Sequence, residues 1–142
     1  MILLLGGTTE GVAAAKAFVD AGHPVLVSQA TEIDMELPAS PLIQSRRGRL
    51  DAGGFERLVR AKRIRAIVDA SHPFARELHR TTARVSRSTG IPRIRLERPA
   101  IGLPPGVVMA RDHLEAAAKA FAIGKTLLLT TGSRSLPLYA RL

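Results

Sequence analysis

The most constraining stretch of the sequence is its beginning, where an apolar run ends abruptly in glycine. Residues 2–5 (ILLL) are followed by Gly6 and Gly7, and Gly11 opens an alanine-rich segment whose apolar residues recur at helical spacing. This order predicts a buried strand, a tight turn and a helix. Gly6 and Gly11 match the first and third glycines of the dinucleotide-binding fingerprint, and Thr8 stands where the second glycine normally lies.

Two interpretations of this turn are open. A helix N-terminus presents unpaired N–H groups and a dipole that attract a pyrophosphate, and the hydroxyls of Thr8 and Thr9 add donors. A glycine turn is also what any strand-helix unit uses to change direction. In the first interpretation, the cofactor-binding residues of the turn are Gly6, Gly7, Thr8, Thr9, Glu10 and Gly11.

Strands and helices are expected to alternate along the rest of the first hundred residues. Further strands are predicted at 24–28, around Ile43, at 66–70 and at 91–97, and helices at 10–21, from Asp51, and from residues 72–74 to about Thr89. Short connections between alternating elements predict an α/β fold with a doubly wound parallel sheet, Rossmann-like, with strand order 3-2-1-4-5. We assign residues 1–99 to this dinucleotide-binding domain.

Residues 100–142 have the pattern of a connector and the beginning of a second, truncated α/β domain. A glycine and proline-rich stretch is followed by a possible short strand at 107–110, a helix that starts with a capping box at Asp112 and Glu115, and a strand at 125–131. Gly132 and Ser133 then form a second strand-to-helix turn.

The expected strand order brings two unusual stretches together. If the first and fourth strands are neighbours, residues 6–11 lie beside residues 69–74 (DASHPF) at the carboxyl edge of the sheet, where ligands of this fold class bind. Three roles are open for His72: a proton donor, a cofactor contact, or the polar start of a helix. Asp69 either orients His72 or caps the turn.

Composition narrows the class of partner. The chain carries 21 Lys and Arg against 12 Asp and Glu, a net charge of +9. Two interpretations are open: a polyanionic partner, which is a phosphorylated cofactor, a polycarboxylate substrate or nucleic acid, and an arginine-rich solvated surface. Four Phe and one Tyr are too few for a single-strand binder, so nucleic acid ranks last and is not expected. The sequence has no Cys and no paired-histidine spacing, so we expect no metal site. Its apolar stretches are too short to span a membrane, so we expect no membrane span. The lack of Cys fits a reducing compartment, and we expect a cytoplasmic location.

The end of the second strand indicates which dinucleotide would bind. An NAD site has Asp or Glu there to hold the ribose 2′-hydroxyl, whereas this chain has Ser28 and Gln29. A neutral Ser28 near Arg46, Arg47 and Arg49 suits a 2′-phosphate, which favours NADP over NAD.

Five short motifs follow one another along nearly the whole chain: GGTTEG at 6–11, GRLD at 48–51, DASHPFA at 69–75, RLERP at 95–99 and TTG at 130–132. Together they resemble the precorrin-6A reductases of cobalamin biosynthesis. The pair DASHPFA and RLERP is the specific part of the resemblance. Ser71 stands where the family usually has Thr, which keeps the hydroxyl. Family members carry a second α/β domain of similar size.

The resemblance implies an activity and a set of roles. The activity is NADPH-dependent reduction of a macrocycle double bond of precorrin-6A, or of its cobalt form, to precorrin-6B. A hydride passes to one carbon and a proton to its neighbour, and arginine forks bind the carboxylate arms of the tetrapyrrole. The predicted residues are catalytic His72 and Asp69, cofactor-binding Ser28, Arg49 and Ser71, and substrate-binding Arg98, Arg95 and Phe74.

An alternative function is that of a truncated NADP-binding remnant without turnover. The sequence does not predict the oligomeric state.

Overall fold

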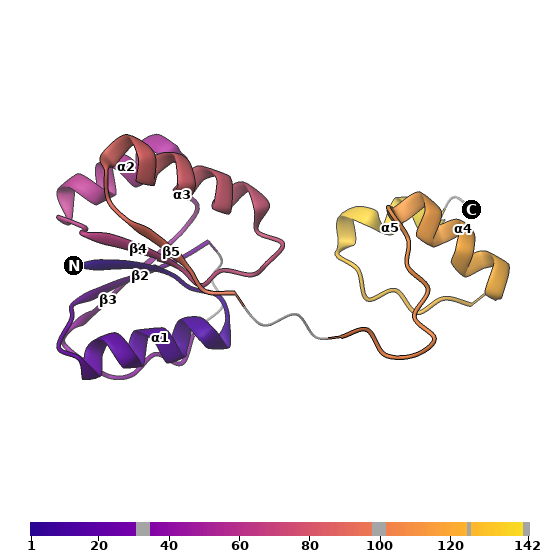
Figure 1. The fold of residues 1–142 in the computed structure, drawn as a ribbon, viewed down its shortest axis with the longest axis horizontal. Coiled ribbons are helices and arrows are strands. Elements are labelled where there is room, and N and C mark those ends of the chain that lie inside the picture. The colour runs from indigo at the N-terminus through magenta and orange to yellow at the C-terminus, as the bar shows by residue number, and fades with distance from the viewer. Residues whose placement is uncertain (31–34, 98–101, 125, 141–142) are drawn as a thin grey trace. The chain divides into compact units, whose positions relative to one another are not determined.

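A computed structural model describes residues 1–30, 35–97, 102–124 and 126–140. The chain forms two compact units, Met1–Pro99 and Ala100–Leu142, each of which is described by itself (Figure 1). None of the helices in the described residues has the length and apolar character of a membrane span.

The first unit is built on a five-stranded, all-parallel sheet. Its strands are β1 (Ile2–Leu5), β2 (Val25–Gln29), β3 (Ile43–Arg47), β4 (Ala66–Asp69) and β5 (Arg93–Arg95). Their order across the sheet is β3-β2-β1-β4-β5, which confirms the predicted doubly wound topology. The chain turns from one half of the sheet to the other between β1 and β4, so the loops that follow these two strands emerge side by side.

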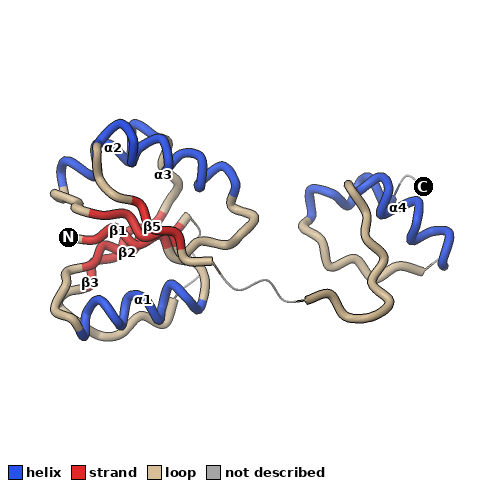
Figure 2. Tube along the Cα trace, in the orientation of Figure 1, coloured by secondary structure: helices blue, strands red, loops and turns tan. Residues whose placement is uncertain are grey.

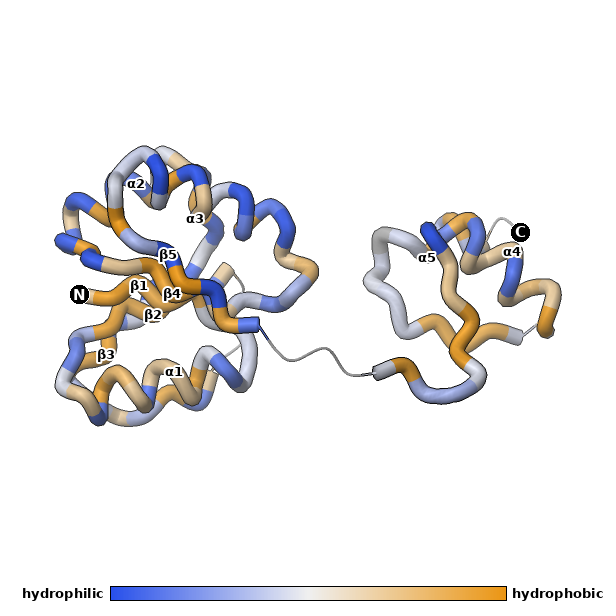
Figure 3. The backbone as a smooth tube through the Cα atoms, viewed as in Figure 1, coloured by the Kyte–Doolittle hydropathy of each residue, from blue (hydrophilic) through white to orange (hydrophobic). Residues whose placement is uncertain are grey.

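Helices cover both faces of this sheet (Figures 1 and 2). The helix α1 (Thr9–Asp20) lies on one face, and α2 (Ala52–Ala61) and α3 (Arg76–Thr89) lie on the other. Successive side chains of a strand point to opposite faces, so Leu3 and Leu5 pack with α2 and α3 while Leu4 packs on the α1 side. Burial on both faces explains why β1 is an uninterrupted apolar run, orange throughout in Figure 3.

The helix ends follow local sequence signals. Asp51 caps α2 by accepting the Gly54 N–H, and Gly90 ends α3 in the left-handed region with φ of 72°. The predicted start of α3 at residues 72–74 is wrong, because the helix begins at Arg76. The backbone of His72 to Ala75 instead closes a turn, with the Ala75 N–H donating to the His72 carbonyl at 2.8 Å.

The second unit contains α4 (His113–Ile123), the short 3-10 helix η1 (Ser133–Ser135) and α5 (Leu136–Ala140). Asp112 caps α4 as predicted. The strands predicted at 107–110 and 125–131 are wrong for the residues described, which take no strand conformation there. A strand needs a neighbouring strand to pair its N–H and C=O groups, and the described part of this unit has none. Apolar side chains of these stretches are consequently exposed, as in Leu128 at 92%.

Candidate functional site

The glycine turn after β1 and the histidine turn after β4 meet at the carboxyl edge of the sheet, as predicted. The Ala70 N–H donates to the Leu5 carbonyl at 3.1 Å, and the Thr8 hydroxyl donates to the Ala70 carbonyl at 2.8 Å. These two bonds join the turns directly. The place where they join is the switch point of the sheet, where ligands of doubly wound folds bind.

The geometry of the glycine turn fits a dinucleotide. A Cβ on Gly11 would lie 3.3 Å from the Gly6 Cα, so this glycine permits close packing of helix and strand. A Cβ on Gly6 would lie 2.8 Å from the Met35 Sδ. Gly7 has φ of +130° and no atom within 4 Å of its Cβ position, which leaves the backbone open at the N-terminus of α1.

The Thr8 hydroxyl has a structural role. It accepts the Gly11 N–H at 3.3 Å as the N-cap of α1 and gives its only proton to the Ala70 carbonyl. The one proton of this hydroxyl is thus used within the protein, and a contact of Thr8 with a phosphate oxygen stays a prediction. The cofactor-binding roles of the Thr8 backbone, Thr9 and Glu10 stay predictions.

At the end of β2, the structure brings Ser28 and Arg46 together. These residues are paired in the β2–β3 register, and the Arg46 Nη1 donates to the Ser28 Oγ at 2.7 Å. The Arg46 Nη2 donates to the carbonyls of Arg47 and Gly48, both at 2.8 Å, so the guanidinium is held in place. Arg49, the predicted cofactor contact, is exposed.

The carboxylate of Asp69 is buried at the end of β4, with 0% exposure, and gathers donors from three elements. Its Oδ1 accepts from the Ser71 hydroxyl at 2.6 Å and the Ser71 N–H at 3.3 Å. Its Oδ2 accepts from the His79 Nδ1 at 2.9 Å and the Arg93 Nη2 at 2.5 Å. Burial raises the pKa of Asp69, but the bonds from Ser71, His79 and Arg93 outweigh it and lower the pKa overall.

This arrangement decides between the two predicted roles of Asp69. The carboxylate makes no described bond to His72 and instead caps the turn by accepting the Ser71 N–H. The Ser71 hydroxyl gives its proton to Asp69, and its cofactor-binding role stays a prediction.

The sequence patterns did not predict that His79 and Arg93 are partners of Asp69. A buried carboxylate at a strand end requires donors, and that requirement was the signal available. Which residues supply the donors depends on how α3 and β5 pack beside β4.

His72 and Phe74 lie at the surface of the same turn. Both side chains are exposed, Phe74 at 81%, and their ring centroids are 5.2 Å apart. The Phe74 N–H donates to the His72 Nδ1 at 3.2 Å, which leaves Nε2 as the outward nitrogen of the ring. An exposed imidazole at a ligand-binding edge can exchange protons with a bound substrate.

Of the predicted substrate-binding arginines, Arg95 lies on β5 beside Asp69 in the register and pairs with Glu97 at 3.0 Å. Arg98 lies outside the described residues.

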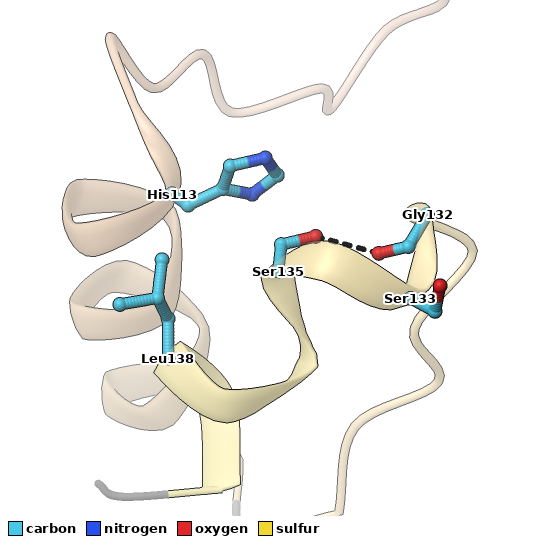
Figure 4. Close-up of a pocket in the computed structure, with 5 residues that line it drawn as sticks. All are labelled: His113, Gly132, Ser133, Ser135 and Leu138. Carbon is cyan, nitrogen blue, oxygen red and sulfur yellow. Dashed lines mark hydrogen bonds between the residues drawn. The ribbon is translucent and has the colours of Figure 1, made fainter.

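Within the second unit, the TTG turn lines a pocket of about 450 Å³ (Figure 4). Its residues are His113, Gly132, Ser133, Ser135 and Leu138. The Ser135 hydroxyl donates to the Gly132 carbonyl at 2.8 Å, and the His113 Nδ1 lies 3.1 Å from the Tyr139 hydroxyl. The first bond closes the turn on itself, and the second joins α4 to α5.

A family model described as Precorrin-6x reductase CbiJ/CobK matches residues 1–142. The chain belongs to this family. A cobalt-precorrin-6A reductase of Priestia megaterium is 33% identical over 141 residues, covering 98% of this chain and 55% of the relative. A precorrin-6A reductase of Rhodococcus erythropolis is 36% identical over 145 residues, covering 99% and 58%.

A solved structure, "CobK precorrin-6A reductase", is similar with a TM-score of 0.70 at 26% identity, over 82% of this chain and 47% of the other. The chain thus spans about half the length of the curated relatives that it matches. The family resemblance drawn from the five motifs is confirmed.

The bond between the two turns can be tested with two substitutions at Thr8, one that keeps the shape of the side chain and one that keeps its hydroxyl. Thr8→Val removes the cap of α1 and the bond to Ala70, so we expect the free energy of unfolding to fall by about 1–2 kcal/mol. Thr8→Ser keeps the hydroxyl and should lose much less. Urea unfolding at pH 7 gives both values, and equal losses in the two variants would contradict the role assigned to the hydroxyl.

The lowered pKa of Asp69 predicts an acid dependence of stability. Because the folded pKa lies below the ordinary 3.8, the contribution of Asp69 is complete above about pH 4 and is lost as the pH falls through the folded pKa. We expect Asp69→Asn to cost about 3 kcal/mol at pH 7 and to remove this part of the acid dependence. Unfolding curves between pH 7 and pH 2 test it, with Asp20→Asn at an exposed pair as the control. Parallel pH profiles for wild type and Asp69→Asn would contradict the assignment.

Proposed function

We propose that the chain carries the NADPH half of a reductase that reduces a macrocycle double bond of precorrin-6A, or of its cobalt form, to precorrin-6B. The observation that carries the proposal is the junction of the glycine turn and the histidine turn at the switch point, in a chain of the Precorrin-6x reductase family. NADPH, when bound, supplies a hydride. We expect the reaction to take place in the cytoplasm, and the absence of Cys suits a reducing compartment.

The open backbone at Gly7 and the N-terminus of α1 would hold the pyrophosphate. A helix of 12 residues directs its dipole toward this turn, and Gly6 and Gly11 keep the turn compact enough for close approach. His72 and Phe74 lie across the junction, so the nicotinamide end of the cofactor would lie against the histidine turn.

The adenosine end would lie over β2 and β3. No carboxylate ends β2, where an NAD site would hold the two ribose hydroxyls, and the Arg46 guanidinium is fixed there by Ser28 instead. Ser28, Arg47 and Gly48 take three of the five guanidinium N–H groups of Arg46, and the two that remain, with the positive charge, suit a 2′-phosphate. Arg46 therefore replaces Arg49 as the first candidate for this contact.

The substrate would bind beside the nicotinamide, with its carboxylate arms on the arginines at the end of β5 and just after it. Arg95 and Arg98 are the candidates for these contacts, and the net charge of +9 favours the approach of a polycarboxylate. His72 is the candidate for the acid that protonates the neighbouring carbon, since its ring is exposed at this edge.

Binding of NADPH without turnover is the second candidate function. The observation that favours it is that the two joined turns, which would hold the cofactor, both lie in the first unit. NADPH oxidation measured at 340 nm with precorrin-6A present separates the two. Turnover that requires precorrin-6A supports the reductase. Saturable NADPH binding without oxidation supports the second function, and the absence of binding contradicts both.

Cofactor preference tests the role of Arg46. We expect NADPH to bind more tightly than NADH, and Arg46→Gln to weaken NADPH binding by about 10–100-fold, the effect of losing one charge-assisted hydrogen bond. The affinity for NADH should change little. Arg65→Gln is the matched control, because it removes the same charge just before β4, at the amino ends of the strands and away from the proposed site. Equal losses in the two variants would show a general charge effect and refute the specific contact.

A further inference from the structure

The two carboxylate oxygens of Asp69 accept hydrogen bonds from different parts of the fold. On the Oδ1 side, both donors come from Ser71, the residue that opens the turn carrying His72 and Phe74. On the Oδ2 side, the donors are His79 from α3 and Arg93 from β5. The carboxylate of Asp69 thus links the half-buried side chains of His79 and Arg93 to an exposed turn.

We propose that His79 and Arg93 are positioning residues, which act through Asp69 and Ser71 to fix the turn that carries His72 and Phe74. This inference rests on the proposed function, because the turn is taken as the nicotinamide side of the site. Neither residue touches a ligand in this account. Their effect on the site passes through two hydrogen bonds of one serine.

The support on the Oδ2 side is itself fixed. The Arg93 Nε donates to the Thr82 Oγ1 at 3.0 Å, and the Thr82 hydroxyl, buried in α3, donates to the Leu78 carbonyl at 2.9 Å. Arg93 is therefore oriented from the same helix that carries His79. Rotation of the Asp69 carboxylate would break bonds on both of its oxygens, so the orientation of Ser71 follows from that of α3.

The imidazole of His79 makes one described hydrogen bond, from Nδ1 to Asp69. Its Nε2 is buried and has no hydrogen-bond partner in the part of the chain that the structure describes. An ionised carboxylate only accepts, so Nδ1 donates to Asp69, and Nε2 adds no hydrogen bond among the described residues. Removing the imidazole would take one donor from the buried Asp69 carboxylate, so His79 stabilises this carboxylate as well as orienting it. The orientation of the carboxylate in turn sets that of Ser71.

The test uses two matched pairs in the full chain. His79→Asn places an amide nitrogen near the position of Nδ1, whereas His79→Gln moves the donor one bond further out. Ser71→Thr keeps the hydroxyl, and Ser71→Val has the same shape without it. Nicotinamide fluorescence gives the Kd for NADPH of each variant, and thermal unfolding confirms that each is folded.

We expect His79→Gln and Ser71→Val to weaken NADPH binding by about tenfold, the usual scale for removing an indirect support, and His79→Asn and Ser71→Thr to stay within about twofold of wild type. The double variant Ser71→Val with His79→Gln should bind no more weakly than either single variant, because both act on one turn. Equal affinities within each pair, or losses that add in the double variant, would overturn the inference. If His79→Gln does not fold, the comparison of Ser71→Val with Ser71→Thr tests the inference.

A second readout separates this inference from the proposed function. If the wild type shows no saturable NADPH binding, the proposed function fails, and the exchange rate of the Ser71 amide proton tests the positioning alone. Faster exchange in His79→Gln than in His79→Asn supports it, because the Ser71 N–H donates to Asp69. Equal exchange rates in the two variants overturn it.

Discussion

The first unit depends on β1, a strand that is buried on both faces and paired on both edges. Leu3, Leu4 and Leu5 are at most 1% exposed, and β1 pairs in parallel with β2 and β4. Because the chain winds outward in both directions from this strand, the loops after β1 and β4 are forced together at the carboxyl edge. The Thr8 bond to Ala70 is the direct result of that constraint.

The same edge is divided into two chemically different ends. Over β2 and β3, a cation fixed by Ser28 and by backbone carbonyls would face the phosphate end of a cofactor. Beyond β4, the negative charge of Asp69 is buried and neutralised by its own donors, and the exposed residues of the turn are His72, Pro73 and Phe74, none of which carries a carboxylate. In the proposed function, this contrast directs the cofactor, with its charged end away from the reacting carbon.

Much of this arrangement could be predicted from the sequence, because it depends on local patterns. Apolar runs and glycine turns predicted the strands and their order, and Asp51, Gly90 and Asp112 predicted helix ends. What could not be predicted depends on register and packing. The pairing of Ser28 with Arg46 selected Arg46 over Arg49, and only the packing of α3 and β5 beside β4 showed His79 and Arg93 as partners of Asp69. The strand predicted at 125–131 is wrong for the described residues, because a strand forms only beside another strand that pairs with its backbone, and the local sequence does not show whether such a strand is present.

The central claim is that the two joined turns form one NADPH site. Titration of the uniformly ¹⁵N-labelled chain with NADPH, followed by amide chemical shifts, tests it most directly. The account predicts that residues 6–11 and residues 71–74 shift together and saturate with one Kd. Saturable shifts confined to other parts of the chain, or different Kd values for the two turns, would contradict it.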